Sequence, residues 1–254
     1  MYFTQWRFAP YARQGEAGIV PPQDCVIRWG NVVGKNDRGA AFREVAQGLE
    51  GIDVAVYEAY GQDPLEPVIG QGDPAVKVAF FGRDPGRDEV QHQMPFIGAG
   101  GQKVRNTLYQ HLYRKEMPDF AASLAVGKRF FWANTVPYKP LGNKAWSMKV
   151  KKQFQPLIAD LLIKEWQGGD VITLGREAFL WFAINQPREV KQQLEAFWGG
   201  DDRFETHTSV MLAALDGTSR KLRLHPLPHP SPLNATWYGR FPALLAARLQ
   251  QLKV

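Results

Sequence analysis

The sequence predicts an α/β fold in which a mostly parallel sheet of four to five strands lies between two layers of helices. Short runs rich in β-branched and aromatic residues alternate with longer segments of helical spacing, and the last two such runs form a hairpin. Strands that alternate with helices pair in parallel and are covered on both faces. A chain of 254 residues with 44% hydrophobic residues is also long enough to bury a full core.

The predicted elements begin at residue 76, after an irregular N-terminal part. Strands are predicted over residues 76–82, 129–136, 170–175, 209–215 and 220–227, the last two joined by a tight turn at Asp216-Gly217. Helices are predicted over residues 101–114, 151–166, 176–184 and 242–252, with a further short helix over 40–50.

Residues 1–60 are rich in Gly, Pro and aromatic side chains and show weak periodicity, so we expect an extension packed on a domain of residues 61–254. The single cysteine, Cys25, excludes an internal disulfide, and we expect an inert thiol there. The sequence contains no long apolar stretch and no apolar segment typical of a signal peptide. We therefore expect a cytoplasmic monomer with no membrane partner.

Basic residues are concentrated in two segments of the chain, although the net charge is only +6. Residues 120–159 contain seven Lys or Arg and no acid, and residues 217–254 contain six and no acid. Solvated helix faces would explain either segment alone. Two acid-free basic segments favour a polyanionic partner.

Ligands bind beyond the carboxyl ends of the strands in sheets of this kind. The first strand is followed by the loop Gly82-Arg83-Asp84-Pro85-Gly86, and the second strand ends near Asn134. Asp84 precedes a turn sequence, so it could simply cap the turn, or its carboxylate could orient water and stabilise a cationic transition state. The buried amide of Asn134 could pair with backbone or with the edge of a pyrimidine.

Two further segments carry candidate functional residues. Phe96 lies beside a glycine run, where it could belong to the core or stack on a base. In the string His229-Pro230-Ser231-Pro232-Leu233-Asn234, the prolines stiffen the loop and fix the directions of His229, Ser231 and Leu233. A lone histidine is usually structural, but a rigid loop inside a basic segment favours a functional one.

Three strings in this order make the chain resemble the uracil-DNA glycosylase superfamily. They are VIGQGDPAVKVAFFGRDPG followed by MPFIGAGGQKV, then FWANTVPYKPLGN, and finally HPSPLN. The resemblance covers residues 68–254 and implies a DNA repair enzyme of base excision. Such an enzyme flips a damaged base out of DNA and hydrolyses its N-glycosidic bond without a metal or cofactor.

The resemblance also implies roles for individual residues. Asp84 and His229 form the implied catalytic pair: Asp84 positions water and stabilises the oxocarbenium-like sugar, and His229 stabilises negative charge at uracil O2. Phe96 stacks on the base and Asn134 recognises it, with Gly82 lining the same pocket. The residues implied to contact DNA are Arg83, Ser231, Asn234 and the wedge residue Leu233.

The chain departs from both branches of the family that it resembles. The iron-sulfur branch holds a cluster with four cysteines, but Tyr138 stands about where one of them would follow the asparagine strand, so no cluster is expected. Arg83 replaces a Glu of that branch and a Gln of the human-type branch. We therefore predict uracil excision, with another deaminated base such as hypoxanthine or xanthine, or an inactive DNA-binding protein, as alternatives.

Overall fold

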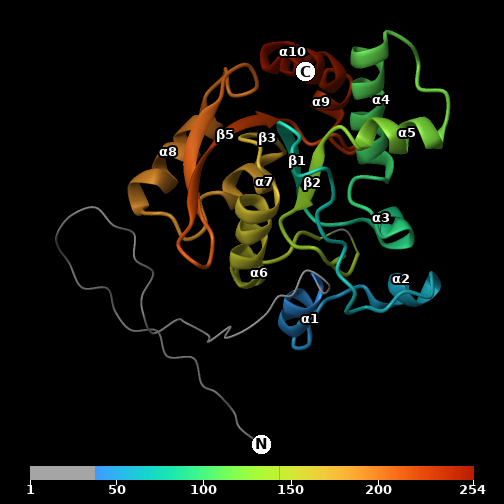
Figure 1. The fold of residues 1–254 in the computed structure, drawn as a ribbon, viewed down its shortest axis with the longest axis vertical. Coiled ribbons are helices and arrows are strands. Elements are labelled where there is room, and N and C mark those ends of the chain that lie inside the picture. Colours follow the sequence, from blue (N-terminus) through green and yellow to red (C-terminus); the bar gives the residue numbers. More distant parts are fainter. Residues whose placement is uncertain (1–37, 143) are drawn as a thin grey trace, which may run out of the picture. The chain divides into compact units, whose positions relative to one another are not determined.

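A computed structural model describes residues 38–142 and 144–254 (Figure 1). The strands are β1 (Val78–Gly82), β2 (Phe131–Asn134), β3 (Asp170–Leu174), β4 (Thr208–Ala213) and β5 (Ser219–Leu227). The helices are α1 (Ala40–Ala46), α2 (Val54–Ala59), α3 (Arg87–His92), α4 (Ala99–Tyr113), α5 (Phe120–Gly127), α6 (Met148–Asp160), the π-helix η2 (Leu161–Glu165), α7 (Arg176–Trp181), α8 (Arg188–Gly199), α9 (Ala235–Tyr238) and α10 (Phe241–Leu252).

The five strands form one sheet in the order β2-β1-β3-β5-β4. All neighbours pair in parallel except β4, which runs antiparallel to β5 as the first arm of the predicted hairpin. The turn between them contains Gly217 at φ 86°, a left-handed backbone conformation that favours glycine. The predicted α/β class and mostly parallel sheet are confirmed.

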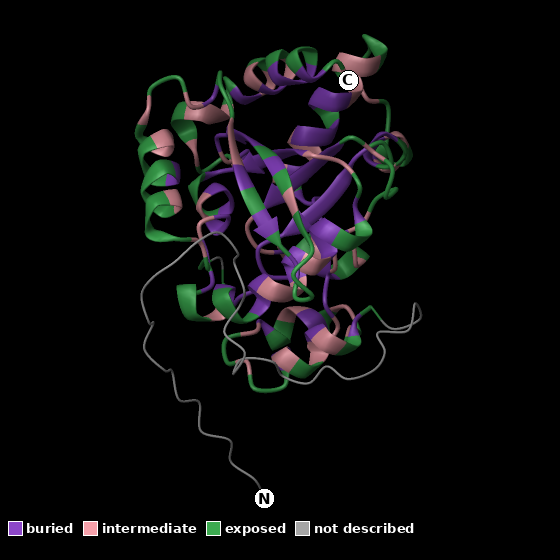
Figure 2. Cartoon of the chain, turned by 60° about the vertical axis from the view of Figure 1, so that its left-hand side comes forward, coloured by how far each residue is buried: buried purple, intermediate pink, exposed green. Residues whose placement is uncertain are grey.

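Side chains of the central strands alternate between two hydrophobic layers. In β1, Phe80 packs on the layer formed with α4, α5 and α10, whereas Phe81 packs on the layer formed with α6, η2 and α7. Every residue of β1, β2 and β3 is buried, and Figure 2 shows these strands as the buried centre of the fold. The sheet therefore lies between two helical layers and forms a rigid base for the loops at its ends.

The described part of the N-terminal segment packs on this domain. The Phe42 ring of α1 stacks on Phe154 of α6, with ring centroids 6.5 Å apart. Between α1 and α2, the buried carboxylate of Asp53 accepts a 2.7 Å hydrogen bond from Lys139 Nζ. Cys25 lies outside the described residues.

The structure corrects two parts of the secondary-structure prediction. The helix predicted over 151–166 begins earlier, at Met148, where Ser147 caps it by accepting the N–H of Val150, and it widens into η2 from Leu161. Helices α2, α3, α5, α8 and α9 were not predicted. Most of them are short, and their stability comes from packing rather than from a long periodic stripe.

Candidate active site

The carboxyl ends of β1 and β2 bring the first predicted site residues together. Gly82 and Asn134 are register partners at the ends of these adjacent parallel strands. Beyond them, the Thr135 N–H donates to the carbonyl oxygens of Gly82 and Arg83, at 2.9 and 3.0 Å. The Thr135 hydroxyl donates to Asp84 Oδ1 at 3.1 Å. The loop that carries Asp84 is therefore fastened to the end of the asparagine strand.

Asp84 is a buried carboxylate with few hydrogen bonds. Its side chain is 1% exposed, and Oδ2, which lies 3.4 Å from Arg83 Nε, has no hydrogen-bond partner among the described residues. Burial raises the pKa of Asp84 to about 6, against the opposing effects of Arg83, Lys151, the Thr135 hydroxyl and the Trp146 N–H. The carboxylate is thus ionised near neutral pH while one of its oxygens remains available to a ligand.

Asn134 has a similar unsatisfied group. The residue is 5% exposed, and Oδ1 accepts no hydrogen bond from the part of the chain that the structure describes. A buried acceptor without a donor lowers stability, because it has lost its hydrogen bonds to water and gains none in the protein. This oxygen is suited to accept an N–H from a bound molecule.

Phe96 is held in an unusual backbone conformation beside these groups. Its φ is 58°, a left-handed value that is uncommon for a residue with a side chain. Its ring lies against Gly82, where an added Cβ would be 2.3 Å from Phe96 Cζ, and its centroid is 5.3 Å from that of Trp132. The absence of a side chain at Gly82 therefore makes room for the aromatic ring at the end of β1.

Two residues that the sequence analysis did not identify fix this segment. Arg105 of α4 is 2% exposed, stacks on Trp132 and donates from Nε to the Phe96 carbonyl oxygen at 2.8 Å. Glu89 of α3 accepts N–H groups from Gly86 and from the residues that follow Phe96. A sequence signal exists for Arg105, which shares the helical stripe of Gly101 and Leu108, both buried.

His229 approaches the same end of the sheet from β5. Its Cβ lies 3.1 Å from the place where a Cβ of Gly175 would stand, and Gly175, which follows β3, has a φ of 88°. Burial, with a smaller effect of Arg83, lowers the pKa of His229 to about 4. The imidazole is therefore neutral at neutral pH, with one ring N–H to donate.

The loop after His229 presents an apolar side chain to solvent. Leu233 is 91% exposed. Within the loop, Ser231 Oγ accepts the Leu233 N–H at 3.2 Å, and Asn234 Nδ2 donates to the His229 carbonyl oxygen at 3.1 Å. The loop lies beside the start of α4, since a Cβ at Gly100 would be 3.3 Å from the Pro230 carbonyl oxygen. These internal hydrogen bonds hold Leu233 outward on a defined base.

The two basic segments contribute fewer surface cations than their sequence suggests. Five of the thirteen are held by internal partners: Lys139, Lys151, Arg220, Arg223 and Arg248. The other eight are exposed, and so is Arg223 despite its bond to Asp170; the eight are Lys128, Arg129, Lys144, Lys149, Lys152, Lys221, Arg240 and Lys253. Any contact with a polyanion through these segments therefore depends on this smaller set.

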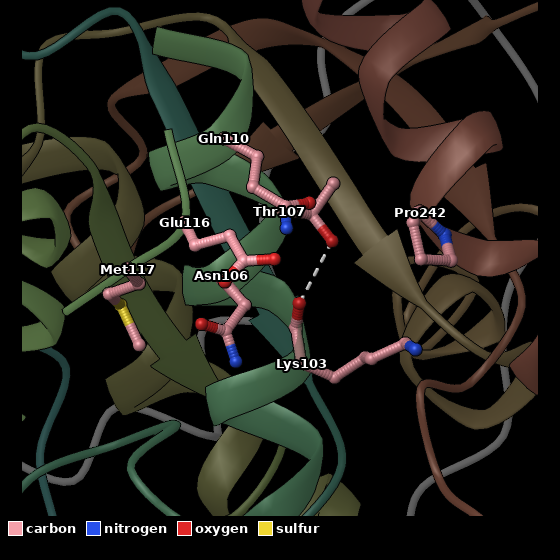
Figure 3. Close-up of a pocket in the computed structure, with 7 residues that line it drawn as sticks. All are labelled: Lys103, Asn106, Thr107, Gln110, Glu116, Met117 and Pro242. Atoms are coloured by element: carbon pink, nitrogen blue, oxygen red, sulfur yellow. Dashed lines mark hydrogen bonds between the residues drawn. The ribbon is translucent and has the colours of Figure 1, made fainter. Parts of the chain in front are cut away.

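A surface cavity of about 300 Å³ lies elsewhere, between α4, the loop that follows it and the start of α10 (Figure 3). Its lining is largely polar and includes Lys103, Asn106, Gln110 and Glu116. None of the predicted site residues lines it. Because it lacks a convergent pair of unsatisfied polar groups, it is a weaker candidate than the site around Asp84.

Among the described residues, no three His, Cys, Asp or Glu side chains gather where they could hold a metal ion. Tyr138, at the position expected for a cluster cysteine, is buried and donates its hydroxyl to the Leu65 carbonyl oxygen at 2.9 Å. The same part of the chain contains no helix with the length and apolar character to span a membrane.

Comparison with protein families identifies the chain. The family model of the uracil DNA glycosylase superfamily matches residues 69–253, which include all of the predicted site residues. A search of curated proteins found no match. The chain therefore belongs to the uracil DNA glycosylase superfamily, whose members are in general DNA glycosylases that act in DNA repair.

Proposed function

We propose that this protein flips uracil out of DNA and hydrolyses the N-glycosidic bond that joins it to deoxyribose. The observation that carries the proposal is the pairing of two unsatisfied buried groups at adjacent strand ends, the Asp84 carboxylate and the Asn134 amide. One suits a developing cation and an attacking water, and the other suits the edge of a pyrimidine.

Asp84 and His229 divide the proposed reaction. As the bond from C1′ to the base breaks, its electron pair moves to the base and the sugar acquires oxocarbenium character. The ionised Asp84 stabilises this cation and orients the water that attacks C1′. The neutral His229 donates its ring N–H to uracil O2, where negative charge accumulates. Water is the nucleophile: as its oxygen bonds to C1′ it passes a proton to the Asp84 carboxylate, and the uracil anion released from C1′ takes up a proton from solvent. The proposed reaction requires no resident metal or cofactor.

Phe96 and Asn134 are the proposed base-binding residues, with Gly82 lining the pocket. The Phe96 ring offers a face for the flipped base to stack on. Asn134 Oδ1 accepts the N3–H of uracil, and its amide N–H donates to O4. This pairing would satisfy the acceptor that is otherwise without a partner.

The exposed loop supplies the proposed DNA contacts. Leu233 fills the space that the flipped nucleotide leaves, and this helps to offset the few kcal/mol that unstacking costs. Ser231 and Asn234 contact the flanking backbone, as does Arg83, whose side chain is 32% exposed. We propose that the protein does so as a monomer in the cytoplasm.

The direct test is incubation with a uracil-containing oligonucleotide, followed by alkali to cleave abasic sites. We expect strand breaks at the uracil position and none in a matched oligonucleotide with thymine. Both single-stranded and double-stranded substrates are needed, because a flipped base is easier to extract from a single strand. Salt-dependent DNA binding without product on either substrate would instead identify an inactive DNA-binding member of the family.

Arg83 favours a second candidate activity on another deaminated base. Its Nε lies 3.4 Å from Asp84 Oδ2, and its charge helps to lower the pKa of His229. Arginine forms two parallel hydrogen bonds with the O6 and N7 acceptors of a purine, a pattern that hypoxanthine and xanthine offer and uracil does not. A panel of lesions in one oligonucleotide context separates the two activities, and faster release of a purine would replace the uracil assignment.

A further inference from the structure

The Glu89 carboxylate joins two loops of the candidate site. Its Oε2 accepts the N–H of Gly86, in the loop that carries Asp84, at 2.9 Å. Its Oε1 accepts the N–H groups of Ile97 and Gly98, directly after Phe96, at 3.1 and 2.8 Å. One side chain thus satisfies three backbone donors from two loops that are separated in sequence by helix α3.

Glycines at both contact points allow the carboxylate to come this close. A Cβ at Gly86 would lie 2.7 Å from Glu89 Oε2, and a Cβ at Gly98 would lie 3.1 Å from the same oxygen. A helix cap alone would explain the bond to Gly86, which precedes the first residue of α3. It does not explain Oε1, which bonds to residues outside that helix.

Phe96 needs such support because its backbone is in the left-handed region. Arg105 holds the Phe96 carbonyl oxygen from α4, and Glu89 holds the next two N–H groups from α3. The peptide groups on the C-terminal side of Phe96 are therefore fixed from two helices. With the backbone held in this way, the ring lies against Gly82.

We propose that Glu89 is a positioning residue that sets the separation between Asp84 and the aromatic ring of Phe96. The inference rests on the proposed function, in which a base stacked on Phe96 must present its C1′ bond to Asp84. Misplacement of a reacting group by about 1 Å can cost on the order of 100-fold in rate. A carboxylate that bonds both loops prevents them from shifting independently.

Glu89→Gln is the sharpest variant, because an amide has only one oxygen and its NH2 group cannot accept an N–H. It keeps the bonds to one loop and loses those to the other. We expect the single-turnover rate to fall by about 10-fold to 100-fold, with affinity for uncleavable DNA unchanged within about twofold. Glu44→Gln, the same substitution at an exposed position of α1, is the matched control and should match the wild type in both measurements.

A double-mutant cycle tests whether Glu89 acts through Phe96. In a Phe96→Ala background the rate effect of Glu89→Gln should largely disappear. If the two substitutions lower the rate independently, so that the double variant shows the product of the two single effects, the proposal is overturned. A Glu89→Gln rate equal to that of the control would also overturn it. A fall in melting temperature with an unchanged rate per folded molecule would show a merely structural role and would also overturn it.

Amide hydrogen exchange keeps this test separate from the proposed activity, because it requires no substrate. Glu89→Gln should accelerate exchange at Ile97 and Gly98 or at Gly86 in the free protein, whereas Glu44→Gln should not. Glu89→Asp, which keeps the charge on a shorter side chain, should have the same direction of effect. Unchanged exchange in both Glu89 variants contradicts the positioning role even if uracil is excised, and accelerated exchange supports it even if another base is the substrate.

Discussion

Two aspartates with buried side chains, Asp84 just after β1 and Asp170 in β3, differ in the direction of their pKa shifts. Asp84 follows β1 at the carboxyl end of the parallel strands, and burial raises its pKa to about 6. Asp170 begins β3 at the other end, beside Val78 of β1. Burial also opposes its ionisation, but hydrogen bonds from Arg223 and His225 outweigh burial and lower the pKa of Asp170.

The two pKa shifts differ in direction because the two carboxylates accept different numbers of hydrogen bonds. Asp170 accepts from Arg223 Nε and Nη2, both at 2.6 Å, and from His225 Nε2 at 2.9 Å. The other ring nitrogen of His225 faces Arg248 Nη1 at 3.1 Å, so it must act as an acceptor, and the ring is neutral. Burial lowers the pKa of His225 to about 4, as it does for His229.

Both histidines are neutral, so their protonation does not distinguish the two sites. The number of hydrogen bonds that each aspartate carboxylate accepts does. Asp170 is 0% exposed and both of its oxygens accept hydrogen bonds, which is typical of a structural ion pair. Asp84 keeps one oxygen without a hydrogen bond among the described residues, at a cost in stability. A group that is costly to keep and unsatisfied in the free protein is a candidate for binding or catalysis.

Asp84→Asn should separate activity from stability most strongly. We expect base excision to fall by about 1,000-fold, because the amide cannot stabilise the cationic sugar. Because the folded pKa is raised, ionisation of Asp84 destabilises the wild type as pH rises from about 4 to about 6. Denaturant unfolding should therefore show the variant to be more stable by up to about 3 kcal/mol at pH 7 and equal near pH 4. A variant less stable than the wild type at pH 7 would contradict the assigned electrostatics.

Asp170→Asn should give the reverse result. The amide keeps one acceptor oxygen, but it removes the negative charge and turns an NH2 group toward the Arg223 and His225 donors, so we expect a loss of about 3 kcal/mol of unfolding free energy at pH 7. The folded pKa of Asp170 is lowered, so its stabilisation is present above about pH 4 and is lost as pH falls further. The excision rate per folded molecule should not change, and a rate loss comparable to that of Asp84→Asn would refute the structural assignment.

His229→Ala tests the histidine at the candidate site against its structural counterpart. Removing a hydrogen-bond donor to developing negative charge typically costs on the order of 100-fold in rate, and we expect that loss in single-turnover excision. His225→Ala is the comparison variant, because this histidine is equally neutral but is used by Asp170 and Arg248. It should lower the melting temperature and leave the rate per folded molecule intact.

The sequence predicted which residues meet at the carboxyl ends of β1 and β2 better than it predicted the residues that hold them there. Gly82, Asp84 and Asn134 follow from a general rule about strand ends, which needs only the positions of strands. Arg105 was missed because an arginine within a helix is ordinarily solvated, and its contacts with the Phe96 and Ser123 carbonyl oxygens depend on tertiary packing.

Charge was the least predictable property, because counting residues along the chain does not show their partners. Lys139 pairs with Asp53, 86 positions away, and Lys151 pairs with Glu177, 26 positions away. Neither pairing leaves a local sequence signal. The basic segments thus combine surface cations with cations that hold the fold together.

Lys151 provides the finest test of how Asp84 differs from Asp170. Its side chain is 3% exposed, pairs with Glu177 and lies in the first turn of α6, where it lowers the pKa of Asp84 together with Arg83, the Thr135 hydroxyl and the Trp146 N–H. Lys151→Met keeps the bulk and removes the charge. The pKa of Asp84 should therefore rise.

The measurement is the pH profile of kcat/KM, whose acidic limb should lie near pH 6 in the wild type if Asp84 must be ionised. In Lys151→Met this limb should move to higher pH, with activity reduced roughly twofold at pH 6 and little changed at pH 8. Lys152→Met, an exposed neighbour, should leave the limb in place. If both variants give the wild-type profile, Arg83 and the hydrogen bonds of the loop are sufficient to set the charge of Asp84. Asp84 and Asp170 would then differ only in the number of hydrogen bonds that each carboxylate accepts, two of which Arg223 donates to Asp170.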